Sequence, residues 1–447
     1  MNSTRRQLVG MLGWAALSRR VGWADDSADH RRPTPTDWRE HFPALAQRLG
    51  GRQLCYLDSA ATTLRPEPVI DELVGFYRGD NANPSASLHT LAQHSHVRYE
   101  GARAEIARFI NAADPNEVVF TRGTTEAINL VASAWGTGLA RGDEILLGIG
   151  EHSSNLVPWL LLARGTGVVL RFFDLDRAGR VRLDDVARKL TGRTRLLGLA
   201  HVSNVLGYIN PVGEIASLAR ARNVRVLVDA AQSVPHIPVD VAALGADFVA
   251  FSGHKMLGPM GIGVLWARRA ILDAMPPYQG GSNMAHDVGI DPAGLDAHLS
   301  SGAHKFGAGT PNVAGALGLA AAVRFLRSIG MGAFRSHEQR LVERGLERLR
   351  PVRGIRLLGP VEPEDRIAVF SFTLDGFTVP EVVRGLDAEG IAVRGGDLAS
   401  TPLLDRFGVR AAIRASCYLY TTTEEIDRLA DALHRLTLRR RLLEAPR

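Results

Sequence analysis

Two residues able to do chemistry follow two short apolar segments in the middle of the chain. Residues 226–228 (Val-Leu-Val) precede Asp229, and residues 248–251 (Phe-Val-Ala-Phe) precede a Ser-Gly-His-Lys sequence that ends at Lys255. Short apolar runs bounded by polar residues are typical of buried strands. Ligands of an open α/β sheet bind beyond the carboxyl ends of its strands. We therefore expect the Asp229 carboxylate and the Lys255 amine to meet in one crevice.

The pairing of a carboxylate with a lysine amine indicates a specific cofactor chemistry. A lysine can form a Schiff base with an aldehyde, and a carboxylate can keep a pyridine nitrogen protonated; pyridoxal phosphate needs both groups. The chain holds only three lysines, Lys189, Lys255 and Lys305, among 53 lysine and arginine residues. Arginine cannot form a Schiff base because its guanidinium stays protonated. The alternative for Lys255, a solvated cation after a strand, is therefore the weaker interpretation.

A second polar turn is a candidate phosphate site. Residues 117–121 read as a strand, and the sequence Arg-Gly-Thr-Thr-Glu that follows leads into a helix over 127–135. Free N–H groups and hydroxyls at a helix start can bind an anion, so Thr124 and Thr125 are candidates for that role. Plain N-capping by threonine is the alternative.

The elements around these turns alternate between strand and helix. Buried-strand patterns at 144–148, 167–173, 196–201, 226–229 and 248–251 are separated by helical segments such as 213–222, and 262–266 returns antiparallel or at an edge. This pattern predicts a doubly wound, mainly parallel sheet with helices on both faces. Residues 279–308 are rich in glycine and predict a loop or hairpin. The helix expected over 313–328 leads into a smaller α+β domain.

The order of these predicted elements divides the chain into four segments. We expect a leader and linker at 1–35, an N-terminal segment at 36–57 that packs with the small domain, a large cofactor-binding domain at 58–320 and a small C-terminal domain at 321–447. The leader carries Arg5-Arg6 before a ten-residue apolar run, which is too short to span a bilayer. It resembles a twin-arginine export signal with cleavage near Ala24, which predicts a periplasmic or secreted enzyme without stable membrane insertion. A basic leader on a cytoplasmic enzyme is the alternative.

The amino-acid composition of the chain argues against several classes of function. The chain has 447 residues, of which 45% are hydrophobic, and a net charge of +6. Its basic residues are scattered and lack interleaved aromatic residues, so we expect no nucleic-acid partner. Cys55 and Cys417 are the only cysteines, which excludes a disulfide framework or a cysteine-based zinc site. We expect no metal.

Motifs along most of the chain resemble the class V aminotransferase-fold pyridoxal-phosphate enzymes, and within them the SufS/CsdA-like cysteine desulfurases and selenocysteine lyases. The resemblance covers almost everything from Tyr56 to the C-terminus. It rests on these stretches: YLDSAAT (56–62), FTRGTTEAINLVA (120–132), EHSSNLVPW (151–159), HVSNVLG (201–207), VDAAQ (228–232), SGHKMLGPMGIG (252–263), GAGTPN (307–312) and IRAS (413–416).

The resemblance implies the aspartate aminotransferase-like fold, fold type I, and a role for each matching residue. Three residues would be catalytic: Lys255, His152 and Asp229. All three would also bind the cofactor, together with these residues: Thr124, Thr125, Gln232, Ser252, His254 and Thr310. Asn204, Arg394 and Arg414 would bind the α-carboxylate of an amino-acid substrate. Thr310 would reach the phosphate of a second subunit, which implies a homodimer.

The chain departs from this family where the substrate side chain would lie. The family's desulfurases carry a nucleophilic cysteine on a mobile loop, and that position is Ala399 here. A His-Arg pair of the family is Ser85-Ala86, and the second histidine of its EHH motif is Ser153. Without a thiolate, persulfide formation is disfavoured. We therefore expect a β-eliminating C–S or C–Se lyase. An aminotransferase or epimerase, and a non-catalytic partner or scaffold with the same fold, are the alternatives.

Overall fold

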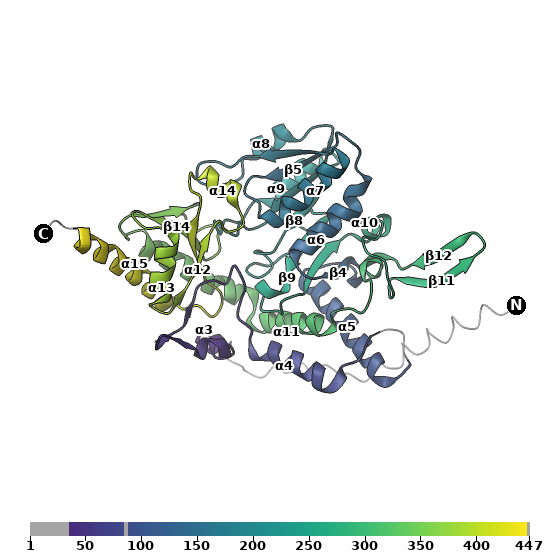
Figure 1. Cartoon of the computed structure of the whole chain (residues 1–447), viewed down its shortest axis with the longest axis horizontal. Helices are drawn as coiled ribbons and strands as arrows, with labels where there is room; N and C mark the ends of the chain where they lie inside the picture. Colours follow the sequence, from purple (N-terminus) through teal and green to yellow (C-terminus); the bar gives the residue numbers. More distant parts are fainter. Residues whose placement is uncertain (1–34, 85–87, 445–447) are drawn as a thin grey trace. The chain divides into compact units, whose positions relative to one another are not determined.

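The computed structural model describes residues 35–84 and 88–444 of the chain. The predicted leader, apart from Pro35, and the Ser85-Ala86 pair lie outside the described residues. In the described part, the seven-stranded and four-stranded sheets described below belong to the same compact unit (Figure 1).

The larger sheet has seven strands in the order β4-β10-β9-β8-β7-β5-β6. Neighbouring strands are parallel except that β10 runs antiparallel to both β4 and β9, as predicted for residues 262–266. The strands are β4 (Val118–Thr121), β5 (Glu144–Gly148), β6 (Val169–Phe173), β7 (Thr194–Ala200), β8 (Arg225–Asp229), β9 (Phe248–Ser252) and β10 (Gly263–Ala267).

Alternate residues of the central strands pack into two different hydrophobic clusters. Val226 and Val228 belong to one cluster, whereas Leu227 belongs to the other. Side chains of a strand point to opposite faces in turn, so each cluster marks one face of the sheet. The helices of this part of the chain are α4 (Glu67–Gly75), α5 (Thr90–Phe109), α6 (Thr124–Leu130), α7 (Val157–Thr166), α8 (Leu183–Lys189), α9 (Val212–Arg220), α10 (Arg269–Ala274) and α11 (Val313–Ile329). The doubly wound, mainly parallel fold of the prediction is confirmed.

The smaller sheet has four antiparallel strands in the order β13-β14-β17-β16. They are β13 (Ile355–Leu358), β14 (Val369–Leu374), β17 (Ala412–Ser416) and β16 (Arg394–Gly396), and the helices of this part are α12 (Met331–Leu349), α13 (Val379–Asp387), α14 (Thr401–Arg406) and α15 (Thr423–Glu444). The single strand predicted at 391–394 is divided: β15 (Ile391–Ala392) pairs with β3 (Cys55–Tyr56), and β16 joins the small sheet.

The N-terminal segment contacts the C-terminal part through that β3–β15 pair. It also contains α3 (Pro35–Glu40) and a small ribbon of β1 (Arg48–Leu49) and β2 (Arg52–Gln53). Asp58 follows β3 and forms an isolated bridge with Ser416 at the end of β17. The predicted domain limits at 57 and 320 remain predictions.

A two-stranded hairpin projects from the large sheet's side of the protein (Figure 1). It consists of β11 (Ala285–Asp291) and β12 (Gly294–Leu299), and it pairs with no other strand in the described structure. Its apolar side chains are solvent-exposed, among them Ile290 at 86% and Leu295 at 74%.

Among the described helices, none is by itself long and apolar enough to cross a membrane. The bent pair of α11 and α12, at 77°, passes by length and composition alone, and most side chains of α11 are buried within the protein.

Candidate active site

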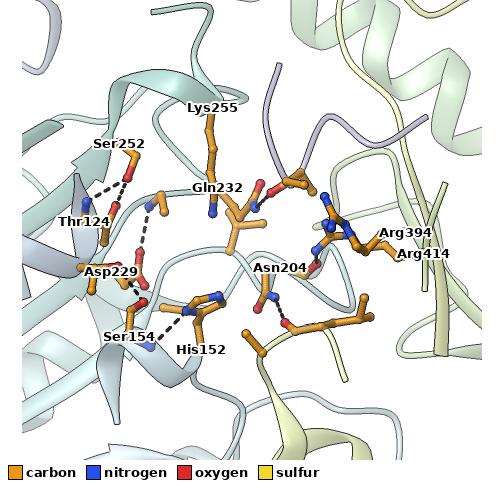
Figure 2. Close-up of a pocket in the computed structure, with 18 of the residues that line it drawn as sticks. Thr124, His152, Ser154, Asn204, Asp229, Gln232, Ser252, Lys255, Arg394 and Arg414 are labelled. Carbon is orange, nitrogen blue, oxygen red and sulfur yellow. Dashed lines mark hydrogen bonds between the residues drawn. The ribbon is translucent and has the colours of Figure 1, made fainter. Parts of the chain in front are cut away.

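The candidate site is a pocket of about 450 Å³ between the two sheets. Figure 2 shows residues of the large sheet on one side and Arg394 and Arg414 on the other. Eleven of the twelve predicted site residues line it: Thr124, Thr125, His152, Asn204, Asp229, Gln232, Ser252, His254, Lys255, Arg394 and Arg414. Thr310 lines a separate groove and accepts a hydrogen bond from Asn83 Nδ2 at 3.0 Å.

Asp229 and Lys255 meet in this pocket, as the strand-end pattern predicted. Asp229 ends β8, and Lys255 ends the short turn that follows β9. Burial raises the pKa of Asp229, although Asp229 Oδ1 accepts a hydrogen bond from Ala231 N at 2.9 Å. Burial lowers the pKa of the Lys255 amine to about 8; the Asp229 carboxylate opposes this shift and the Arg414 cation adds to it. A large fraction of Lys255 is therefore neutral near pH 8, as a nucleophile or base must be.

A group of hydroxyls lies at the end of β4 and the start of α6. Ser252 Oγ accepts a hydrogen bond from Thr124 N at 2.8 Å and lies 2.7 Å from Thr124 Oγ1. Thr125 Oγ1 lies 2.8 Å from Ser154 Oγ. Gly263 of β10 lets this turn approach the strand, because a Cβ on Gly263 would stand 2.4 Å from Gly123 Cα. These hydroxyls form a compact polar cradle suited to a phosphate.

His152 lines the pocket, and the next residue, Ser153, contacts Ala399. His152 Nδ1 accepts a hydrogen bond from Ser154 N at 3.1 Å, so its other nitrogen carries the proton when the ring is neutral. Burial, followed by the charge of Lys255, lowers its pKa to about 4. The ring is therefore neutral near pH 7 and can lie flat against an aromatic ligand without a charge penalty.

The two pocket arginines share one carboxylate that the sequence interpretation had not assigned. Arg394 Nη2 donates to Asp58 Oδ2 at 2.8 Å, and Arg414 Nη2 lies 3.4 Å from Asp58 Oδ1. Arg414 is buried, it donates through Nη1 to Asn204 O at 3.0 Å, and its Nε has no partner in the described structure. The YLDSAAT motif contained Asp58, but only the fold brings it to residues more than 330 positions later.

Asn204 is less available than the prediction supposed. Its Nδ2 donates to Leu398 O at 2.9 Å, and its Oδ1 accepts from Ser400 Oγ at 3.2 Å. Both ends of the amide are thus used by the loop after β16. A role in binding substrate carboxylate remains a prediction for Asn204.

The loop after β16 places Ala399 in the pocket lining, together with Asp397 and Leu398. Cys55 and Cys417 lie instead in the hydrophobic cluster of the small sheet, with exposed fractions of 0% and 1%. Burial raises the pKa of both thiols well above the ordinary range for cysteine. Neither thiol is in the pocket, and both are protonated near neutral pH.

Glu151 is a buried carboxyl that sequence reasoning missed. It accepts a hydrogen bond from Asn155 Nδ2 at 2.7 Å, and Asn155 Oδ1 accepts from Trp159 Nε1 at 3.0 Å. Burial raises its pKa to about 8, and the nearby Asp229 carboxylate adds to the shift. Glu151 does not line the candidate pocket itself but lies close enough to Asp229 for the two carboxyl groups to interact. The sequence signal that could have identified Glu151 was its position directly before His152, at the start of the EHSSNLVPW stretch.

The donor and acceptor set fits pyridoxal phosphate. Gln232 Oε1 is buried with no partner among the described residues, while its Nε2 is held by Ala60 O at 2.8 Å. A buried amide oxygen without a partner is costly, so it indicates a ligand group at that point. Asp229, Lys255 and the hydroxyl cradle supply the acid, amine and phosphate contacts that this cofactor requires. In the described chain, no group of three His, Cys, Asp or Glu side chains could hold a metal ion.

Comparisons with known proteins agree with this assignment. A probable cysteine desulfurase of Halalkalibacterium halodurans is 44% identical over 88% of this chain and 96% of its own length. The structure of the cysteine desulfurase CsdA of Escherichia coli superposes with a TM-score of 0.83 at 37% identity, covering 91% of this chain and all of that one. A C-DES mutant described with glycine covalently linked to its PLP cofactor gives a TM-score of 0.76 at 26% identity over 89% of this chain and 98% of that chain. The profile of the family described as Aminotransferase class-V matches residues 55–429. Family and fold support pyridoxal phosphate as the cofactor, and the chain belongs to the class-V aminotransferase family.

Proposed function

We propose that this protein is a pyridoxal-phosphate enzyme that removes a sulfur or selenium substituent from the β-carbon of an L-α-amino acid by elimination. One observation carries the proposal. Ala399, which the sequence resemblance places at the family's cysteine position, lines the pocket, and the only two thiols of the chain are buried elsewhere. A methyl group cannot attack sulfur, so a route that needs no enzyme thiolate is favoured.

The pocket supplies the groups that such a reaction needs. Bound pyridoxal phosphate would supply an electron sink for negative charge at the substrate Cα. Arg414 lines the pocket, its Nε has no partner among the described residues, and it would bind the substrate carboxylate in a charge-assisted hydrogen bond. Lys255 Nζ, with a pKa near 8, can accept the Cα proton. Loss of that proton and departure of the β-substituent with its bonding electrons would give a keto acid, ammonia and a thiol or selenol after hydrolysis.

The test is product analysis of the cofactor-loaded enzyme with L-cysteine and L-selenocysteine. Elimination predicts pyruvate and free sulfide or selenide in equal amounts. L-Alanine as the product would indicate desulfuration, and a pyridoxamine form of the cofactor would indicate transamination, the second candidate within this family. Failure to form any lysine-bound cofactor band would favour a non-catalytic scaffold.

We also propose that the protein acts as a homodimer. An isolated two-stranded hairpin is marginal in water, and the β11–β12 hairpin exposes Ile290 and Leu295. A second copy of the chain would bury this surface and place Thr310 near a neighbouring pocket. Light scattering of the wild type and of a variant with Ile290→Glu and Leu295→Glu tests this; the wild type should have twice the molar mass of the variant.

A further inference from the structure

The loop at the family's cysteine position is held in one conformation across the pocket. Leu398 and Ala399 both have left-handed backbones, at φ 53° and 54°, which side-chain-bearing residues adopt only when other contacts fix them. Asn204 Nδ2 binds Leu398 O, and Ser153 binds Ala399 O through both its backbone N and its Oγ. The loop therefore presents its side chains at fixed positions.

Asp397 is the charged side chain that this loop adds to the pocket. Its Oδ1 accepts a hydrogen bond from Ala399 N at 3.1 Å. Its Oδ2 has neither a hydrogen bond nor an ion pair with any described residue, and the side chain is solvent-exposed. Arg394 and Arg414, the pocket's two arginines, are both directed to Asp58.

Asp229 and Asp397 are the two acidic residues that line the pocket in the described structure. His152 is neutral near pH 7 and lies close enough for Asp397 to influence its pKa. Lys255 and Asp229 lie on the cofactor side of the pocket, at the ends of the large-sheet strands. Arg414, Asp397 and Ala399 line the same pocket, so we expect the β-substituent of a substrate whose carboxylate is bound by Arg414 to reach Asp397 and Ala399.

We propose that Asp397 selects substrates whose β-substituent carries an amine or another N–H donor. This inference rests on the proposed function, because it assumes that an amino acid binds in this pocket. The Asp397 carboxylate attracts a cation or accepts an N–H hydrogen bond, and it repels a second carboxylate. Because the side chain is exposed, solvent weakens the selection, and a preference of about three- to fivefold is expected.

The test uses three cysteine derivatives of similar length and different charge: S-(2-aminoethyl)-, S-(2-hydroxyethyl)- and S-(carboxymethyl)-L-cysteine. Their Kd values are measured from the change in cofactor absorbance of the loaded enzyme, and keto acid release is measured separately. The wild type should bind the aminoethyl compound about three- to fivefold more tightly than the hydroxyethyl compound, and the carboxymethyl compound most weakly. Asp397→Asn keeps an acceptor for Ala399 N and should make the three Kd values similar.

Asp405→Asn is the matched control, because Asp405 is an exposed acid of the adjacent α14 outside the pocket lining. It should keep the wild-type ranking. Equal Kd ratios in wild type and Asp397→Asn would overturn the inference. So would an absence of binding by all three compounds when L-serine still changes the spectrum. Binding in the expected order without keto acid release would instead contradict the proposed elimination and leave the role of Asp397 standing.

Discussion

Ser153 donates two hydrogen bonds to a single oxygen of Ala399, from its backbone N at 2.8 Å and from its Oγ at 2.9 Å. Ser153 follows His152 directly, so the residue beside the cofactor position and the loop across the pocket are connected through one side chain. Ser153 and Ala399 are two of the positions at which the sequence interpretation expects a departure from the family. They lie in contact although 246 positions separate them.

Ser153→Ala should loosen the loop without removing it. The substitution deletes one of the two hydrogen bonds to Ala399 O, and such a bond contributes about 0.5–1.5 kcal/mol to stability. Amide hydrogen exchange in the peptide covering 397–404 should speed up about two- to tenfold. Ser336→Ala, which removes an exposed helix hydroxyl, is the control. Unchanged exchange in this peptide would show that the backbone bond alone holds the loop.

Ala399→Cys should introduce a protein-bound persulfide after incubation with L-cysteine. A thiol at this position lines the pocket, whereas the wild-type methyl group can carry no sulfur. Mass spectrometry after a thiol trap should find the modification in the variant and no persulfide in the wild type. Wild-type persulfide on Cys55 or Cys417, formed as fast as sulfur is released, would restore the ordinary desulfurase interpretation.

Lys255→Ala should abolish the lysine-bound cofactor band and lower kcat by about a hundredfold or more, since the variant loses the base near the substrate Cα. Borohydride reduction followed by peptide mapping checks the attachment. Lys305→Ala is the matched control, because Lys305 lies outside the pocket lining and donates to Asp273 O. A reducible cofactor adduct in the Lys255→Ala variant would contradict the assignment.

Reloading of the cofactor-free enzyme should depend on pH through Lys255. Below its pKa of about 8 the amine is protonated and cannot attack an aldehyde, so the loading rate should rise up to about pH 8 and level off above it. An amine with the ordinary value of 10.5 would keep gaining rate to pH 10. Asp229→Asn removes the carboxylate that raises this pKa and should move the midpoint to lower pH. Stopped-flow absorbance across pH 6.5–10 measures both.

Export by the twin-arginine route is a prediction from sequence alone. Arg5→Lys combined with Arg6→Lys should retain the protein in the cytoplasm, and the mature wild-type chain should begin near Asp25. N-terminal sequencing of protein from each cell fraction provides the measurement. A wild-type cytoplasmic protein that begins at Met1 or Asn2 would show that the leader is no signal.

Much of the large sheet could be predicted because its strands are continuous apolar runs. The strand expected at 144–148 matches β5, and the strand-end rule brought Asp229 and Lys255 together correctly. The residues at which helices begin were harder to predict from the sequence. The helix expected over 127–135 begins earlier, at Thr124, with Gly123 at its N-cap and no side-chain capping bond.

The contacts that shape the substrate side of the site were not predictable. The Asp58–Arg394 and Ser153–Ala399 contacts join segments that are distant in sequence and carry no periodic signal. In the sequence, Asp397 was only one residue of the loop over 394–402, and no motif indicated a role for its side chain. That neither pocket arginine pairs with the Asp397 carboxylate became apparent once the fold showed that both arginines contact Asp58.

The burial of Cys55 and Cys417 in one cluster has a practical consequence for the study of this protein in solution. A native chain whose two thiols are both inaccessible should take up no maleimide dye until the small sheet opens, so dye uptake would time the unfolding of that sheet. Because the two native thiols are buried, a dye that reacts with an engineered surface thiol should give no background signal from the native protein. A fluorophore attached through a single thiol engineered on the β11–β12 hairpin would report subunit exchange without removal of any native cysteine.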